Sequence, residues 1–255
     1  MIPSRERLIV ALDVSSSAGA QKIVTSLGES VQIYKVGMQL YTAEGPQIVR
    51  ELVAAGREVF LDLKYHDIPN TVAAAVREAA QLGVSMLTVH ASGGTKMLRA
   101  ATEAAQAEIR GHAHAPQAFT TGAARELRLK VLAVTVLTSM DESDVNEIGV
   151  QTALRNQVVR LASLALKAGC DGVVSSAQEA RALRGQLGPE FLIVTPGVRP
   201  PGAVHADQAR VVTPAEAITA GAPHIVVGRP ITGAKDPRIA AEQIRQEIEA
   251  TALAR

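Results

Sequence analysis

Short apolar runs rich in Val, Ile and Leu alternate along this chain with longer, Ala-rich stretches whose apolar residues recur at helical spacing. The apolar runs predict eight strands, over residues 8–13, 32–37, 58–64, 86–90, 131–138, 172–175, 191–195 and 224–228. The other stretches predict helices over residues 18–27, 46–55, 70–82, 95–109, 151–168, 178–187, 214–220 and 237–253. Strand and helix therefore alternate from one end of the chain to the other.

Repeated alternation of this kind is typical of a (β/α)8 (TIM) barrel. No Pro-, Gly- or Ser-rich linker divides the sequence, so we expect a single barrel domain over residues 1–255. A doubly wound open sheet is the alternative, but the Gly-x-Gly-x-x-Gly fingerprint that follows its first strand is absent. Asp141 is a candidate helix N-cap. Residues 111–128 lack a firm period and predict an insertion beside the site or a surface loop.

Composition narrows the class of protein. With 47% apolar but only 2% aromatic residues, the core must be built from Ala, Val, Leu and Ile, which suits parallel strands covered on both faces. A formal charge of +1 gives no basic field for nucleic acid, and no apolar stretch reaches membrane-spanning length.

The apolar run that ends at Asp13 is too short for a signal-peptide core. The lone Cys170 excludes an intrachain disulfide and is expected to be a buried structural thiol. We therefore expect a cytoplasmic protein without nucleic-acid or membrane partners.

Polar residues stand at the carboxyl ends of the predicted strands. The strand ends carry Asp13, Lys35, Asp62 with Lys64, His90, Thr138 and the pair Gly228-Arg229. In a barrel these ends converge on one mouth, where active sites lie. A charge inside an apolar strand costs several kcal/mol unless it is paired, so a cluster of Asp and Lys there calls for a reason.

The densest group of charges is Asp-Leu-Lys-Tyr-His-Asp-Ile-Pro-Asn-Thr, residues 62–71. Residues two apart on a strand share a face, so Asp62 and Lys64 should point into the mouth together. Asp67 falls in the following loop, and Lys35 reaches the same mouth from the neighbouring strand. A buried salt-bridge network that only fills the barrel end is the alternative reading. Two lysines and two aspartates at strand ends, with phosphate-suited features downstream, favour a functional site.

The phosphate-suited features follow strands seven and eight. Barrel phosphates commonly bind beside the loops after these strands. Arg199 and Arg229 offer planar forks of donors, and the backbone at Gly228 adds an N–H group. Gly197 and the Pro-rich stretch up to residue 203 resemble a lid loop. The histidines show no metal-ligand spacing, so no metal site is expected.

Residues 62–71 resemble the Asp-x-Lys-x-x-Asp-Ile-x-x-Thr signature of the orotidine 5′-phosphate decarboxylase family, in its short bacterial type. The resemblance runs nearly from end to end of the chain. Its other parts are Leu-Ile-Val-Ala-Leu-Asp13, Tyr-Lys35-Val-Gly-Met, Val-His90-Ala-Ser-Gly-Gly, Val-Leu-Thr138-Ser, Thr-Pro196-Gly-Val-Arg199-Pro, Asp207-Gln208 before Arg-Val-Val-Thr-Pro, and Val-Gly228-Arg229-Pro-Ile.

The resemblance implies a cofactor-free decarboxylase of orotidine 5′-monophosphate in de novo pyrimidine biosynthesis, built as a homodimer with shared active sites. It implies that Lys64 protonates C6 of the pyrimidine, with Asp62 close to the departing carboxylate. It further implies that Asp67 enters from the partner subunit and that Lys35 links the charged groups. Substrate-binding roles are implied for Asp13 and Lys35 at the ribose, for Thr71 beside Asp67, and for Thr138 at the pyrimidine. They are also implied for Arg199, Gln208, Gly228 and Arg229 at the phosphate end, and for Pro196.

Two other functions remain open. Enzymes of the same barrel suprafamily, such as keto-gulonate-phosphate decarboxylases and hexulose-phosphate synthases, share the Asp-x-Lys-x-x-Asp core but use a divalent metal. The Ile-Pro-Asn-Thr continuation, the Thr138 motif and the Asp207-Gln208 pair argue against them. A catalytically silent nucleotide-binding barrel is the second alternative. The presence of Lys64 argues against it.

Overall fold

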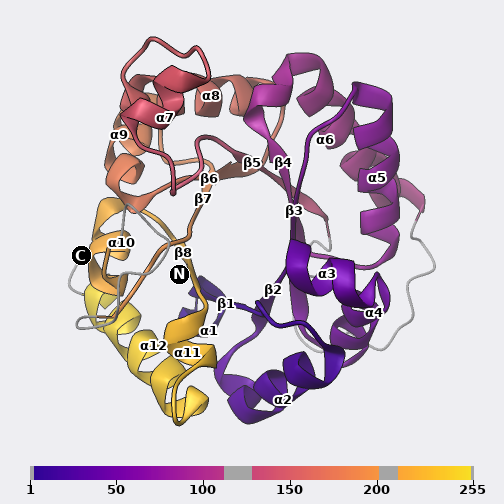
Figure 1. Cartoon of the computed structure of the whole chain (residues 1–255), viewed down its shortest axis with the longest axis vertical. Helices are drawn as coiled ribbons and strands as arrows, with labels where there is room; N and C mark the ends of the chain where they lie inside the picture. The colour runs from indigo at the N-terminus through magenta and orange to yellow at the C-terminus, as the bar shows by residue number, and fades with distance from the viewer. Residues whose placement is uncertain (1–2, 112–127, 201–211, 254–255) are drawn as a thin grey trace.

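A computed structural model describes residues 3–111, 128–200 and 212–253. Eight parallel strands pair in chain order, and β8 pairs with β1, which closes the sheet into a barrel (Figure 1). The strands are β1 (Leu8–Ala11), β2 (Ile33–Gly37), β3 (Glu58–Tyr65), β4 (Met86–His90), β5 (Lys130–Val134), β6 (Gly172–Val174), β7 (Leu192–Thr195) and β8 (His224–Val227). The predicted (β/α)8 barrel is confirmed.

Helices surround this barrel. The longer ones match the predicted helices to within a few residues and are α2 (Ser17–Leu27), α4 (Gln47–Ala54), α5 (Pro69–Gln81), α6 (Gly94–Gly111), α8 (Leu154–Lys167), α9 (Ala177–Leu187), α10 (Pro214–Ala220) and α12 (Pro237–Leu253). In the described part of the chain, none of the helices combines the length and apolar character needed to cross a bilayer.

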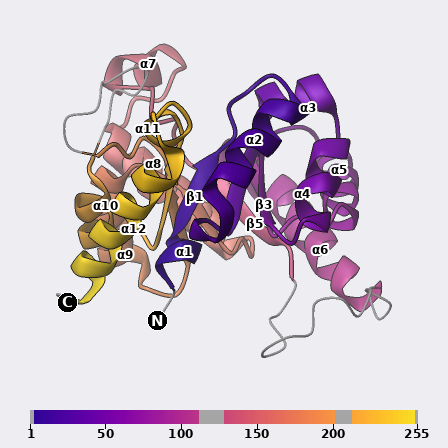
Figure 2. The same ribbon diagram turned by 90° about the horizontal axis from the view of Figure 1, so that it is seen from below.

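Four short helices were not predicted: α1 (Ser4–Arg7), α3 (Met38–Glu44), α7 (Glu142–Glu147) and α11 (Arg229–Thr232). The last three follow the carboxyl ends of β2, β5 and β8, and Figure 2 shows them on one side of the barrel, opposite the two chain ends. The predicted N-cap Asp141 starts α7, where its carboxylate accepts hydrogen bonds from the backbone N–H groups of Ser143 and Asp144. Helices α3, α7 and α11 thus build part of the rim of the barrel mouth, whereas α1 precedes β1 at the opposite end.

Several strands end earlier than predicted. β1 stops at Ala11, so Asp13 lies two residues beyond it, and β5 stops at Val134, so Thr138 lies in the loop before α7. The predicted strand extended past the end of β5 because Val136 is apolar and buried, although it is not paired in the sheet. Both polar residues therefore stand above the sheet rather than within it.

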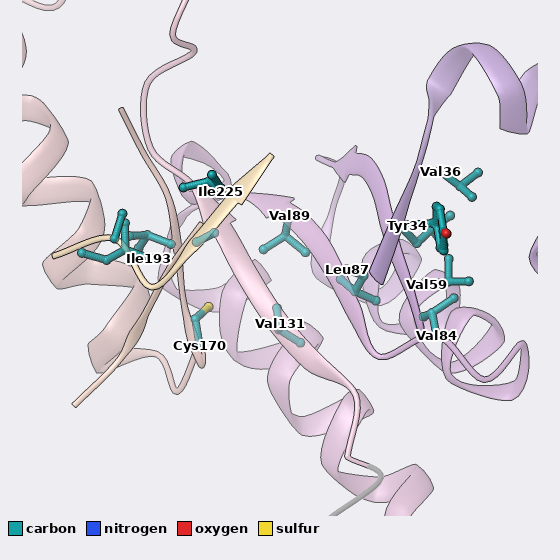
Figure 3. Close-up of a cluster of buried hydrophobic side chains, with 14 of the residues drawn as sticks. Tyr34, Val36, Val59, Val84, Leu87, Val89, Val131, Cys170, Ile193 and Ile225 are labelled. Carbon is teal, nitrogen blue, oxygen red and sulfur yellow. The ribbon is translucent and has the colours of Figure 1, made fainter. Parts of the chain in front are cut away.

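The apolar residues form two layers. Side chains inside the barrel make a small cluster of Ile9, Ala11, Ile33, Phe60, Met86, Leu132, Val194 and Val226. Side chains on the outer face of the sheet pack against the helices; Figure 3 shows Tyr34, Val59, Leu87 and Ile193 among them. Cys170 lies in this outer layer as predicted, and burial raises the pKa of its thiol to about 12.

The inner cluster is an apolar floor beneath the mouth. Inward positions alternate along each strand, so the next inward residue above Ile33 on β2 is Lys35. Above Phe60 on β3 comes Asp62, and above Met86 on β4 comes Thr88. The barrel interior therefore changes from apolar to polar within one layer of side chains.

Candidate active site

The strand that carries the central charges is irregular. Leu61 of β3 pairs with Leu87 of β4, but the next pair is Tyr65 with Val89. β3 thus advances four residues while β4 advances two, and the extra chain bulges out between them. Within this bulge Lys64 has a φ of 54°, and it is the one non-glycine residue of the described ranges with a positive φ. Such a backbone costs energy in any residue with a Cβ, and residues strained in this way cluster at functional sites.

The bulge lies at the pair of residues that regular alternation predicted to face the mouth together. Asp62 and Lys64 do meet, with Lys64 Nζ 3.0 Å from Asp62 Oδ1. The alternation argument did not predict the turn of the chain at Lys64 or the break in the pairing with β4. Thr88 holds the turn, since its Oγ1 accepts a hydrogen bond of 2.9 Å from the backbone N–H of Lys64.

Four side chains form a continuous ionic array across β1, β2 and β3. Lys35 Nζ lies 2.9 Å from Asp13 Oδ1 and 3.9 Å from Asp62 Oδ2. Asp62 then pairs with Lys64, so the charges alternate along the row. Each lysine side chain has a carboxylate beside it, which offsets much of the cost of taking these charges out of water.

The array is closed below and open above. The side chains of Lys35 and Asp62 are only 12% and 14% exposed, and Lys64 is 23% exposed, whereas Asp13 at the upper end is 55% exposed. A ligand entering the mouth would meet fixed ammonium groups over an apolar floor. At a site largely shielded from water, a fixed charge interacts with a charged ligand far more strongly than it would in bulk solvent.

Asp67 and Thr71 stand apart from the array. Both are exposed, and the Asp67 carboxylate accepts a hydrogen bond of 2.6 Å from the backbone N–H of Ile68. Among the described residues, Asp67 makes no ion pair with Lys64. Ile68 beside it is 66% exposed, so this part of the loop before α5 presents both an acid and an apolar side chain to the outside.

The predicted phosphate end is only partly described. Gly228 lies against the array, because a Cβ built on it would be 3.6 Å from Asp13 Oδ2, and Arg229 begins α11 directly after it. Pro196 follows β7, and the backbone N–H of Arg199 donates to the carbonyl of Val212. Thr138 is buried in the loop after β5. Gln208 and Asp207 lie outside the described residues, as does most of the segment 111–128.

Sequence reasoning left two groups near the array unassigned. His66 and His90 stack at a tilt with ring centroids 5.4 Å apart. Thr88, which reasoning from the sequence missed entirely, is fully buried between Asp62 and the Lys64 backbone. The one available signal was a polar residue at an inward position of β4, two residues before His90. In the described ranges no group of three or more His, Cys, Asp or Glu side chains is placed to hold a metal ion.

His90 should make stability depend on pH. Burial lowers its pKa below the usual value, and nearby His66 and Lys64 lower it further, against a smaller opposite effect of Asp62. Because the folded pKa is below the unfolded one, the unfolded chain binds more protons as pH falls below about 6.5. The folded state therefore loses stability in that range. We expect the urea midpoint to fall less between pH 7.5 and 5.5 in His90→Gln than in the native protein, at equal protein concentration. An equal fall in both would contradict this role of His90.

A closed (β/α)8 barrel with an ordered array of compensated charges at its carboxyl-end mouth defines a barrel enzyme that acts on a small molecule. The model of the orotidine 5′-phosphate decarboxylase / HUMPS family matches residues 6–244. The chain belongs to this family.

Relatives of similar length are named after the first of the two activities in the family's description, orotidine 5′-phosphate decarboxylase. A protein of Geobacter sulfurreducens named orotidine 5′-phosphate decarboxylase is 49% identical over 247 residues, covering 97% of this chain and 98% of that protein. One of Halorhodospira halophila with the same name is 50% identical over 249 residues, covering 98% of each. Among solved structures, orotidine 5′-phosphate decarboxylase from Lactobacillus acidophilus superposes with a TM-score of 0.79 at 38% identity, over 95% of this chain and 99% of that one.

Proposed function

We propose that this chain, acting as one barrel domain, converts orotidine 5′-monophosphate to uridine 5′-monophosphate and CO2 without a cofactor, in the cytoplasm. The observation that carries the proposal is the Lys64 ammonium, held 3.0 Å from Asp62 at the barrel mouth by a strained bulge. Relatives about half identical to this chain bear the name of that reaction.

The chemistry explains why fixed charges are needed. When the bond between C6 and the carboxylate breaks, the electron pair stays on C6 in an sp² orbital with no adjacent carbonyl to accept it. Lys64 stabilises this negative charge and then donates an Nζ proton to C6, and solvent restores that proton afterwards. Asp62 faces the carboxylate of the bound substrate, so the departure of neutral CO2 removes a repulsion between two negative groups.

The remaining residues bind the parts of the substrate that do not react. Asp13 and Lys35 bind the ribose hydroxyls, and Thr138 contacts the pyrimidine. The residues that bind the phosphate lie after β7 and β8 and are Pro196, Arg199, Gln208, Gly228 and Arg229. Energy from phosphate binding supports catalysis by holding the pyrimidine against Lys64.

We also propose that a second copy of the chain completes each site. Asp67 and Thr71 are exposed, and the Asp67 carboxylate is bonded to the Ile68 amide rather than to the array of its own chain, which is the arrangement expected of residues that serve a neighbouring site. Ile68 next to them is 66% exposed and Met38 at the start of α3 is 56% exposed, so apolar side chains are available around the mouth for a partner to cover.

The proposal is tested by following the absorbance of orotidine 5′-monophosphate with purified, metal-stripped protein in a chelator. Conversion to uridine 5′-monophosphate at an unchanged rate in chelator is the expected result. A protein that converts nothing under these conditions, but acts on a keto-sugar phosphate after Mg²⁺ is added, would assign the chain to the metal-dependent branch of the family instead.

The close approach of Gly37 to the end of the Lys35 side chain allows a second test, of the proposed substrate-binding role of Lys35. A Cβ at Gly37 would lie 2.8 Å from Lys35 Nζ and 3.6 Å from Asp13 Oδ1. The φ of Gly37 is −97°, which alanine adopts freely, so Gly37→Ala should fold and displace only the lysine end. Losing charged hydrogen bonds of this kind should lower kcat/KM about 10-fold or more. Gly185→Ala in α9, where a Cβ meets nothing within 4 Å, is the matched control and should keep full activity. Equal kinetics of the two variants would contradict the role of Lys35.

A further inference from the structure

Thr88 connects the two central charged residues through a single buried hydroxyl. Its side chain is 0% exposed at an inward position of β4. Oγ1 accepts a hydrogen bond of 2.9 Å from the backbone N–H of Lys64 and donates one of 3.0 Å to Asp62 Oδ1. The same Oδ1 accepts from Lys64 Nζ at 3.0 Å. Hydrogen bonds therefore form a closed ring that runs from the Lys64 amide through Thr88 and Asp62 to the Lys64 ammonium.

The direction of each bond in this ring is fixed. A backbone N–H only donates, so Thr88 must accept from Lys64, and its own proton is left for the carboxylate. An ionised carboxylate only accepts, so Asp62 takes both protons offered to Oδ1. Because no bond in the ring can be reversed, the ring defines one geometry for the side chain of Asp62 and for the chain at Lys64.

The ring also explains how the backbone at Lys64 is kept in a left-handed conformation. A φ of 54° costs energy in a residue with a Cβ, and the sheet pairing is interrupted between Leu61 and Tyr65. The Thr88 hydroxyl gives the Lys64 amide a partner at the point where the ladder to β4 is interrupted. Without it, a half-buried amide would lose its hydrogen bond and the bulge would be free to relax.

We propose that Thr88 is a positioning residue for the reaction: its hydroxyl aims Lys64 by holding the bulge and orients Asp62 by donating to Oδ1. The inference rests on the proposed function, in which Lys64 and Asp62 act on the substrate. Thr88 forms hydrogen bonds with both of these residues. In this proposal it acts through them and does not itself touch the substrate.

The test compares Thr88→Val, which keeps the shape but removes the hydroxyl, with Thr88→Ser, which keeps the hydroxyl. A displacement of about 1 Å in a catalytic group can cost about 100-fold in rate, so we expect Thr88→Val to lower kcat by about 10- to 100-fold. KM should change by less than about 3-fold, because the proposed ribose and phosphate contacts do not involve Thr88. Thr88→Ser should stay within about 5-fold of the native kcat.

Thr102→Val is the matched control. Thr102 is a buried threonine on α6 whose hydroxyl bonds to the carbonyls of Arg99 and Ala168, far from the mouth. The variant loses a buried hydroxyl, as Thr88→Val does, but its kcat should be unchanged. A loss of activity in both valine variants, in proportion to their loss of stability, would reduce Thr88 to a purely structural residue and overturn the proposal.

Hydrogen exchange of the Lys64 amide supplies a readout that does not need turnover. Thr88→Val should expose this amide to faster exchange, while Thr88→Ser keeps it protected. If the native protein fails to decarboxylate orotidine 5′-monophosphate, the proposed function falls and the exchange result alone decides whether Thr88 holds the bulge. An unchanged kcat in folded Thr88→Val, or a Thr88→Ser variant as impaired as the valine, overturns the positioning role.

Discussion

Lys64→Ala is expected to lower kcat for orotidine 5′-monophosphate by at least about 10⁴-fold. In the proposed mechanism, the substitution removes both the proton donor to C6 and the cation nearest to the developing carbanion. General acid catalysis contributes about 10²–10⁴-fold in enzymes, and one fixed electrostatic contact about 10²–10³-fold. The two effects act through one side chain and are not strictly additive, so the lower bound is set near the larger of them.

The fold should survive this change. Asp62 keeps the hydrogen bond from Thr88 and the neighbouring Lys35, so the substitution does not strand a lone buried carboxylate. Circular dichroism and the urea midpoint check this directly. Lys22→Ala, an exposed lysine of α2, is the control for the loss of one positive charge and should keep native activity. Steady-state decarboxylation by purified Lys64→Ala above about 0.01% of the native rate would contradict the role of Lys64 as proton donor.

Much of the fold could be predicted because a (β/α)8 barrel repeats one simple pattern. Long amphipathic helices such as α5 and α12 carry enough residues for their period to be recognised. Short helices do not: Asp141 was identified as an N-cap, yet the six-residue α7 behind it has no period of its own. Strand ends were extended too far for a related reason. Apolar residues such as Val136 continue past the point where the neighbouring strands stop pairing.

The candidate site shows where local patterns stop being informative. The clustering of Lys35, Asp62 and Lys64 followed from their places near strand ends, and the distances bear out their proximity. The bulge did not follow, because it depends on Thr88, which is 24 residues away from Lys64 along the chain and comes from the next strand. A threonine in a strand is ordinary in sequence, and only the folded barrel shows what its hydroxyl contacts. Asp67 raises a further difficulty. If it serves the site of another subunit, as proposed, the contacts within its own chain, such as the hydrogen bond from the Ile68 amide, do not reveal that role.

Mixing two inactive variants, Lys64→Ala and Asp67→Ala, is expected to restore activity. If Asp67 acts in the partner's site, a heterodimer has one site with native Lys64 and native Asp67, and one site that lacks both. Random exchange makes about half of the dimers heterodimers, so about one quarter of all sites become native. Activity should therefore rise from near zero in either variant to about one quarter of the native value per site. Subunit exchange is verified by native mass spectrometry with one variant isotopically labelled.

The alternative arrangement gives a sharply different result. If Asp67 turned inward and served its own Lys64, every site in the mixture would carry one of the two substitutions, and activity would stay near zero after complete exchange. The position of Asp67 favours recovery, because its carboxylate is exposed and occupied by the Ile68 amide rather than by the nearby ammonium. Turning it inward would mean breaking that hydrogen bond and leaving the Ile68 amide without its partner. Bringing up a second subunit to cover Ile68 instead buries apolar surface and requires no such rearrangement.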